Sequence, residues 1–154
     1  MSDLKTEIKQ TRPFSSVQEE AHLSIIRTAA MLSHAFNEAI RDHGITGTQY
    51  NALRVLRGAG PKGLCRNEVR DRLVARVPDA TRLLDRLERL GLIERERQGE
   101  DRRYVTTRIT AAGLALLAQL DEPVQAIHRA QLADASETEL RTVVSVLGRL
   151  RNRL

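Results

Sequence analysis

The chain has 154 residues, which suffices for one ordinary domain or a small binding unit with extra helices, and leaves little room for a catalytic domain as well. Hydrophobic residues make up 41% and charged residues 29%, so a core can form and wholesale disorder is excluded. The net charge of +5 and an isoelectric point of about 10.1 favour a polyanionic partner.

Cysteine content and the distribution of apolar residues narrow the class of protein further. The single cysteine excludes an intrachain disulfide framework and leaves no paired thiols for a zinc knuckle. The first residues are polar and charged, and no later apolar run is long enough to cross a bilayer. We therefore expect a cytoplasmic protein that has no membrane partner.

The N-terminal part divides into an arm and a long helix. Residues 1–15 hold few apolar groups at any regular spacing, which predicts a flexible arm. From Val17 to His43, apolar side chains recur every three or four residues, as is typical of an amphipathic helix. Gly44 is expected to end this helix.

Two short helices follow, each with a recognisable first turn. Thr46 and Gln49 have the spacing of a capping box, and the helix that they start should end at the glycine-rich turn of residues 58–63. Cys65 and Glu68 repeat the spacing and predict a third helix.

The fourth helix is predicted to start at Pro78, because proline suits the first helical position, and to run to Leu90 before Gly91. Val77 then precedes the helix where a capping Ser or Thr is expected, so this helix start is predicted either to lack a side-chain cap or to be capped by another residue. Its inward face holds Ala80, Leu83, Leu84 and Leu87.

The periodicity then changes from helical to strand-like. Residues 92–97 and 104–109 are short strand-like stretches on either side of a polar loop, residues 98–103. This loop is too long for a tight two-residue turn, and the segment is interpreted as a β-wing.

Two C-terminal helices complete the prediction. Thr110 caps the first of them, in which Pro123 is expected to cause a kink, and Ser136 with Glu139 forms the capping box of the second. The last helix carries a heptad seam, which predicts a partner helix and hence a dimer. The seam consists of Leu140, Val143, Leu147, Leu150 and Leu154.

This order of elements predicts a mainly α fold with a small β-wing, the winged helix-turn-helix, whose later helix enters the major groove of DNA. If the apolar residues of the fourth helix face the core, the opposite face presents the residues expected to bind DNA: Asp79, Thr81, Arg82 and Arg86. Arg82 suits a guanine edge or a phosphate, Thr81 a base or a phosphate, and Arg86 the backbone.

At this point the sequence resembles the MarR family of bacterial regulators. The resemblance rests on TQYNALRVL in the first short helix, PDATRLLDRLERLGLIER in the recognition helix and first wing strand, and EDRRYVTTRIT in the wing. Its most specific part is Asp101-Arg102-Arg103 followed by Ile109-Thr110, which matches the Asp-x-Arg wing motif of the family.

The resemblance carries expectations about site residues and organisation. It implies that Arg103 inserts into the minor groove and that Asp101 holds the shape of the wing; we expect Arg102 to bind DNA together with Arg103. Residues 46–110 would be the DNA-binding domain, and residues 16–45 and 111–154 the helical dimerisation region. Double-stranded DNA, a second copy of the chain and a small aromatic or anionic effector are the implied partners of a ligand-responsive repressor that binds a pseudo-palindromic operator.

Several alternatives remain open on the sequence alone. In one alternative, the arginines of the fourth helix and first wing strand simply pair with neighbouring carboxylates: Asp85, Glu88, Glu94 and Glu96. Cys65 at a helix start suggests a redox switch, although a structural thiol fits as well. A helical protein-binding adaptor without DNA affinity is a further alternative. No nucleophile, metal-ligand cluster or phosphate-binding glycine loop is evident, so neither an enzyme nor a cofactor is predicted.

Overall fold

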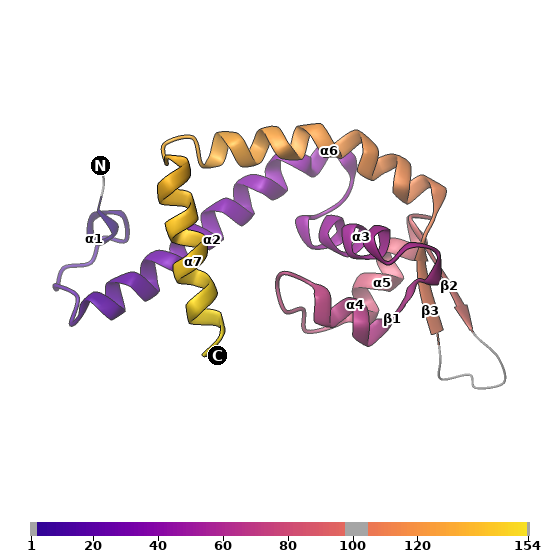
Figure 1. Cartoon of the computed structure of the whole chain (residues 1–154), viewed down its shortest axis with the longest axis horizontal. Helices are drawn as coiled ribbons and strands as arrows, with labels where there is room; N and C mark the ends of the chain where they lie inside the picture. Colours follow the sequence, from indigo (N-terminus) through magenta and orange to yellow (C-terminus); the bar gives the residue numbers. More distant parts are fainter. Residues whose placement is uncertain (1–2, 98–104, 154) are drawn as a thin grey trace. The chain divides into compact units, whose positions relative to one another are not determined.

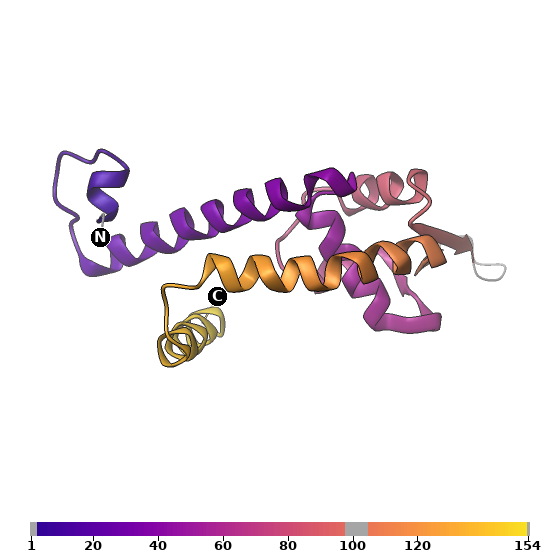
Figure 2. The same cartoon turned by 90° about the horizontal axis from the view of Figure 1, so that it is seen from above.

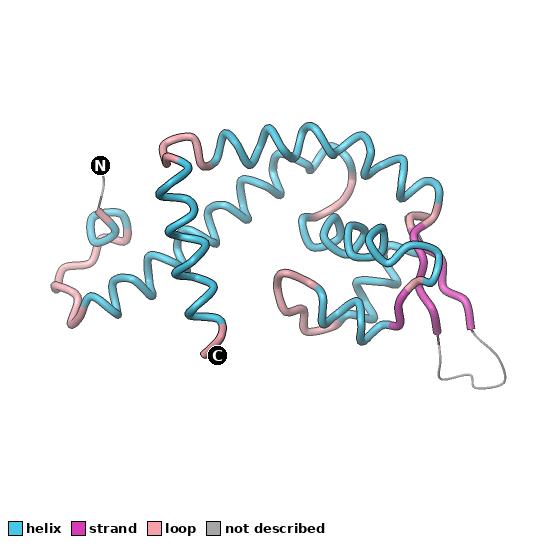
Figure 3. The backbone as a smooth tube through the Cα atoms, viewed as in Figure 1, coloured by secondary structure: helices cyan, strands magenta, loops and turns pink. Residues whose placement is uncertain are grey.

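The computed structural model describes residues 3–97 and 105–153. It forms two compact units, Met1–Ala118 and Gln119–Leu154. The fold is mainly helical with a small antiparallel sheet, as predicted (Figures 1 and 3). The elements are α1 (Leu4–Glu7), α2 (Val17–Ile40), η1 (Arg41–His43), α3 (Gly47–Ala59), η2 (Gly60–Lys62), β1 (Leu64–Cys65), α4 (Arg66–Arg72), α5 (Ala80–Arg89), β2 (Ile93–Arg97), β3 (Val105–Ile109), α6 (Ala111–Gln131) and α7 (Glu137–Arg151).

The long N-terminal helix α2 is continuous from Val17 to Ile40 (Figure 2). Its start is capped by Ser16, whose Oγ accepts a hydrogen bond from the Glu19 amide at 3.1 Å. The last predicted turn tightens into η1, and Gly44 then takes a positive φ of 73°. The short helix α1 was not predicted. It forms because the Asp3 carboxylate accepts from the Thr6 amide at 2.8 Å.

Side chains and backbone join α2 firmly to α3. The Asn37 Oδ1 atom accepts a hydrogen bond from the Gly47 amide at 2.7 Å. The rings of Phe36 and Tyr50 pack with their centroids 5.6 Å apart. The predicted capping box of Thr46 is present, and it fixes the direction in which α3 leaves this junction.

The helices α3, α4 and α5 share one core. Its central side chains are at most 1% exposed, so each contributes about 1.5–3 kcal/mol of burial energy. They are Leu53, Leu56, Val69, Leu84 and Leu87. Because these residues come from all three helices, the core fixes the position of α5 against the other two.

The sheet has the strand order β1-β3-β2, and both pairings are antiparallel. Strands β2 and β3 run from the pair Ile93 and Ile109 to the pair Arg97 and Val105, as the hairpin prediction requires. The third strand, β1, was not predicted. The strand can pair with β3 because Gly63 precedes it: Gly63 has a φ of +66°, and a Cβ there would lie 2.6 Å from the Thr107 carbonyl oxygen.

The start of α6 is tied to the end of the sheet. Thr110 caps the helix by accepting from the Gly113 amide at 3.2 Å, and its hydroxyl donates to the Gly91 carbonyl at 2.7 Å. A Cβ at Gly113 would lie 2.3 Å from the Leu92 carbonyl oxygen, so glycine alone fits there.

The second unit consists of the C-terminal part of α6 and of α7. Helix α6 is assigned as continuous through Pro123, and α7 starts with the predicted capping box of Ser136. Leu140 and Leu147 are half-buried, whereas Val143 and Leu150 are 51% and 46% exposed. Leu154, the last seam residue, lies outside the described residues. Among the described helices, none combines the length and apolar character that a membrane span requires.

Candidate nucleic-acid interface

The start of the recognition helix differs from the prediction. Helix α5 begins at Ala80 and not at Pro78, and Asp79 is its N-cap. The Asp79 carboxylate accepts a hydrogen bond from the Arg82 amide at 2.9 Å. The predicted start at Pro78 was therefore wrong, and of the two alternatives for the cap the second is correct, because Asp79 caps the helix and Pro78 simply precedes it.

The outward face of α5 is the predicted one. Ala80, Leu84 and Leu87 are buried, and Leu83 is half-buried. The exposed side chains on the other faces include Thr81, Arg82, Arg86 and Arg89. Helical periodicity alone thus sorts this helix into a core face and a polar face.

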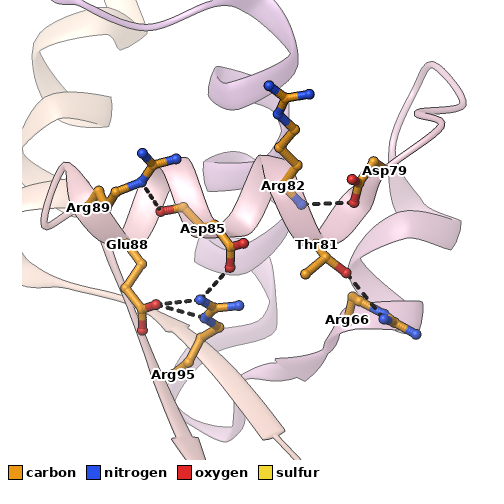
Figure 4. Close-up of polar contacts among 8 residues, drawn as sticks. All are labelled: Arg66, Asp79, Thr81, Arg82, Asp85, Glu88, Arg89 and Arg95. Atoms are coloured by element: carbon orange, nitrogen blue, oxygen red, sulfur yellow. Dashed lines mark hydrogen bonds and ion pairs between the residues drawn. The ribbon is translucent and has the colours of Figure 1, made fainter.

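One arginine of the wing binds both acidic side chains of α5. Arg95 of β2 donates from Nη2 to Asp85 Oδ1 at 2.6 Å and from Nε to Glu88 Oε2 at 2.9 Å (Figure 4). The hydrogen bonds from Arg95 lower the pKa of Glu88, and those to Glu88 and Asp85 raise the pKa of Arg95. The network fixes β2 against the recognition helix.

The remaining arginines of α5 keep their charge available. Among the described residues, no carboxylate lies within ion-pair distance of Arg82, Arg86 or Arg89. Arg89 donates to the Asp85 carbonyl oxygen at 3.3 Å, and Figure 4 shows it on the same side of α5 as Arg82. Within the part of the chain that the structure describes, mutual neutralisation therefore holds for Arg95 but not for these three side chains.

A further arginine, from the preceding helix α4, also contacts α5. Arg66 Nη1 donates a hydrogen bond to Thr81 Oγ1 at 3.2 Å (Figure 4). Arg66, Thr81 and Arg95 line a hollow of about 420 Å³. Sequence reasoning missed Arg66, because nothing in the local pattern indicates a contact with a residue fifteen positions later.

The turn between α4 and α5 is held by a side chain of α3. The Asn51 Oδ1 atom accepts a hydrogen bond from the Val74 amide at 2.8 Å. Figure 3 shows this connection, residues 73–79, as a loop. The bond satisfies a backbone donor just after α4 and so limits the freedom of the loop that leads into α5.

The wing strands are described, but the predicted wing-tip residues are not. Asp101, Arg102 and Arg103 lie outside the described residues. At the described base of the wing, Arg108 donates to the Glu96 carboxylate at 2.7 Å and to the Pro61 carbonyl oxygen at 2.8 Å. These bonds join the two strands to each other and to the turn before β1.

Cys65 is half-buried at the N-terminus of α4 and belongs to the lining of the same hollow. Its amide donates to the Glu68 carboxylate at 2.8 Å, which confirms one half of the predicted capping arrangement. Within the described ranges, no group of three or more His, Cys, Asp or Glu side chains is arranged to hold a metal ion.

Comparison with known proteins agrees with this geometry. A model of the MarR family matches residues 43–103. The chain is 25% identical over its whole length to the HTH-type transcriptional regulator PecS of Dickeya dadantii (strain 3937), of which it covers 94%.

Solved structures extend the comparison to the fold. A MarR transcription factor from Planctomyces limnophilus is 38% identical, with a TM-score of 0.69 over 88% of this chain and 98% of the other. A mutant MarR from E. coli complexed with operator DNA is 25% identical, with a TM-score of 0.77 over 97% and 99% of the two chains. These relatives are transcription regulators and not enzymes. The chain therefore belongs to the MarR family and is a DNA-binding transcription regulator of the winged helix-turn-helix type.

Proposed function

We propose that the chain is a ligand-responsive repressor that binds a pseudo-palindromic operator as a homodimer. One observation carries the DNA-contacting part: the acidic side chains of α5 are bound by Arg95, whereas Arg82 and Arg86 have no carboxylate partner among the described residues. A helix face with free guanidinium groups suits phosphates and guanine edges. Thr81 and Arg82 lie on the first turn, where base edges come within reach.

The proposed residue roles follow from position. Thr81 and Arg82 contact bases, Arg86 contacts the backbone, and Asp79 supports the first turn as the N-cap. The wing residues Arg102 and Arg103, oriented by Asp101, contact the minor groove; this assignment rests on the sequence motif alone.

The proposed dimer rests on apolar side chains of the terminal helices. On α7, Val143, Val144 and Leu150 are between 46% and 68% exposed. On α2, Ile26 and Met31 are each 53% exposed. Exposed apolar surface of this kind is typical of an interface with another chain. A homodimer would give two recognition helices for two half-sites.

The proposed effector is a small aromatic or anionic molecule. Such a molecule lowers DNA affinity only if it binds more tightly to a conformation whose spacing does not fit the operator. Repression follows where the operator overlaps a promoter.

A mobility-shift assay on the DNA flanking the chain's own gene tests the proposal. We expect a shifted complex that weakens steeply with salt, because phosphate contacts release counterions. The variant Arg82→Glu should abolish the shift, whereas Arg41→Glu, at an exposed α2-terminal pair with Glu38, should preserve it. Equal binding by both variants would contradict the assignment of α5, and a monomer in sedimentation velocity would contradict the dimer.

A further inference from the structure

Arg66 lies outside the recognition helix but is bound to it. It is the first residue of α4, and besides Thr81 its one hydrogen-bond partner among the described side chains is the neutral Asn67, with Nη2 to Oδ1 at 3.4 Å. None of the ion pairs among the described residues includes Arg66. Its positive charge is therefore not balanced by a carboxylate of the part of the chain that the structure describes.

A comparison with Arg95 shows what is particular about Arg66. Both guanidinium groups line the same hollow, but Arg95 is only 24% exposed and binds Asp85 and Glu88. Arg66 is exposed, and its hydrogen bonds within residues 3–97 and 105–153 go to the neutral oxygens of Thr81 and Asn67. Of the five N–H donors of a guanidinium, the two described bonds use two. Arg66 thus retains both charge and donors beside the first turn of α5.

The hydrogen bond from Arg66 also determines whether the Thr81 hydroxyl donates or accepts a hydrogen bond toward DNA. The Thr81 oxygen accepts from a cationic donor, so a second donor approaching that oxygen meets the positive charge. The favourable orientation points the hydroxyl proton away from Arg66, which makes Thr81 a hydrogen-bond donor. In the major groove a donor suits purine N7, guanine O6 or thymine O4, and it does not suit the amino group of cytosine.

We infer that Arg66 is a further DNA-contacting residue: it contacts a phosphate beside the recognition helix and holds the Thr81 hydroxyl as a donor toward a base acceptor. This inference rests on the proposed binding of DNA by α5. It assigns Arg66 two separable effects, one on the electrostatic part of the affinity and one on base preference.

The experiment uses the full chain and a library of random duplexes. The wild type first enriches its preferred sequence, and the affinity of each variant for that duplex is then measured across a series of salt concentrations. Arg66→Gln removes both the positive charge and the planar set of guanidinium donors, whereas Arg66→Lys keeps the charge but not that set of donors. Thr81→Val removes the hydroxyl group but keeps the branched shape of the side chain. Arg41→Gln is the matched control for the loss of one exposed arginine.

We expect Arg66→Gln to weaken binding about tenfold and to reduce the slope of log affinity against log salt by about 1 for each subunit. Arg66→Lys and Thr81→Val should keep the slope but lose the preference for an acceptor base at one position of each half-site. The double variant Arg66→Lys with Thr81→Val should lose no more preference than either single variant, because both act through one hydroxyl.

The outcomes separate the inference from the proposed function. If Arg66→Gln keeps the wild-type slope and preference while Arg82→Glu abolishes binding, the role of Arg66 is overturned and the proposed function stands. If the wild type enriches no sequence, both are overturned. A thermal melt of each variant shows whether it is folded, and the Lys variant tests base preference even if the Gln variant unfolds.

Discussion

The substitution Arg95→Gln tests the network that joins the wing to the recognition helix. A hydrogen bond to a charged group contributes about 1.5–3 kcal/mol, whereas an exposed ion pair contributes about 0–1 kcal/mol. Arg95 is 24% exposed and its partners Asp85 and Glu88 are 44% and 39% exposed, so solvent screens the network in part. We expect the free energy of unfolding to fall by about 1–2 kcal/mol, which is a decrease in Tm of about 3–6 °C for a chain of this size.

The loss should depend on pH. The folded-state pKa of Glu88 is below 4.5, its ordinary value, so its contribution to stability is present above that value. The contribution is lost as the pH falls through the lower, folded-state pKa. The difference in Tm between wild type and Arg95→Gln should therefore be largest near neutral pH and shrink below pH 4.5.

Thermal melts of three variants provide the assay. Arg41→Gln, which breaks an exposed pair with Glu38, should change the stability by less than about 0.5 kcal/mol. The triple variant Asp85→Asn, Glu88→Gln and Arg95→Gln should be more stable than Arg95→Gln alone, because no carboxylate then loses its cation. A triple variant as unstable as the single one, or a loss that does not change with pH, would refute the electrostatic reasoning.

Three further predictions concern the core, the start of α6 and the terminal helix. Leu53→Ala should lower the free energy of unfolding by about 2–5 kcal/mol in urea titration, since Leu53 is 0% exposed; a loss below 1 kcal/mol would contradict its place in the core. Gly113→Ala should cost about 1–3 kcal/mol by the same assay, because its Cβ would meet the Leu92 carbonyl at 2.3 Å, whereas Gly58→Ala meets nothing within 4 Å and serves as the control. Val143→Arg should shift the chain toward monomer in sedimentation velocity, and an unchanged dimer would exclude this side chain from the interface.

Local signals were sufficient to predict most of the fold. The capping boxes of Thr46 and Ser136 placed two helix starts correctly, because each depends on residues only three positions apart. The same local rules failed at α5, where proline at the first helical position and aspartate at the N-cap predict different starts. Strand β1 was missed because two residues show no alternation; it exists through its pairing with β3.

The candidate site divides in the same way. The exposure of Thr81, Arg82 and Arg86 follows from the helical period and was predicted. Thr81 lies fifteen residues after Arg66, and Glu88 and Asp85 lie seven and ten residues before Arg95, so these pairs meet only after α4, α5 and β2 have packed. No periodicity or capping rule specifies which of several nearby carboxylates or hydroxyls a given arginine will bind.

The junction of α2 and α3 has a mechanical consequence. The bond between Asn37 and Gly47 and the contact between Phe36 and Tyr50 both span the short connection, since each joins a residue of α2 to a residue of α3. A Cβ at Gly47 would lie 3.1 Å from the nearest carbon of the Phe36 ring, so the ring would have to move by a few tenths of an ångström to accommodate it. Because both contacts hold the two helices together, a rotation of the last turns of α2 displaces the first turn of α3. A conformational change can thus be transmitted between these helices without any molecule contacting the DNA-facing residues.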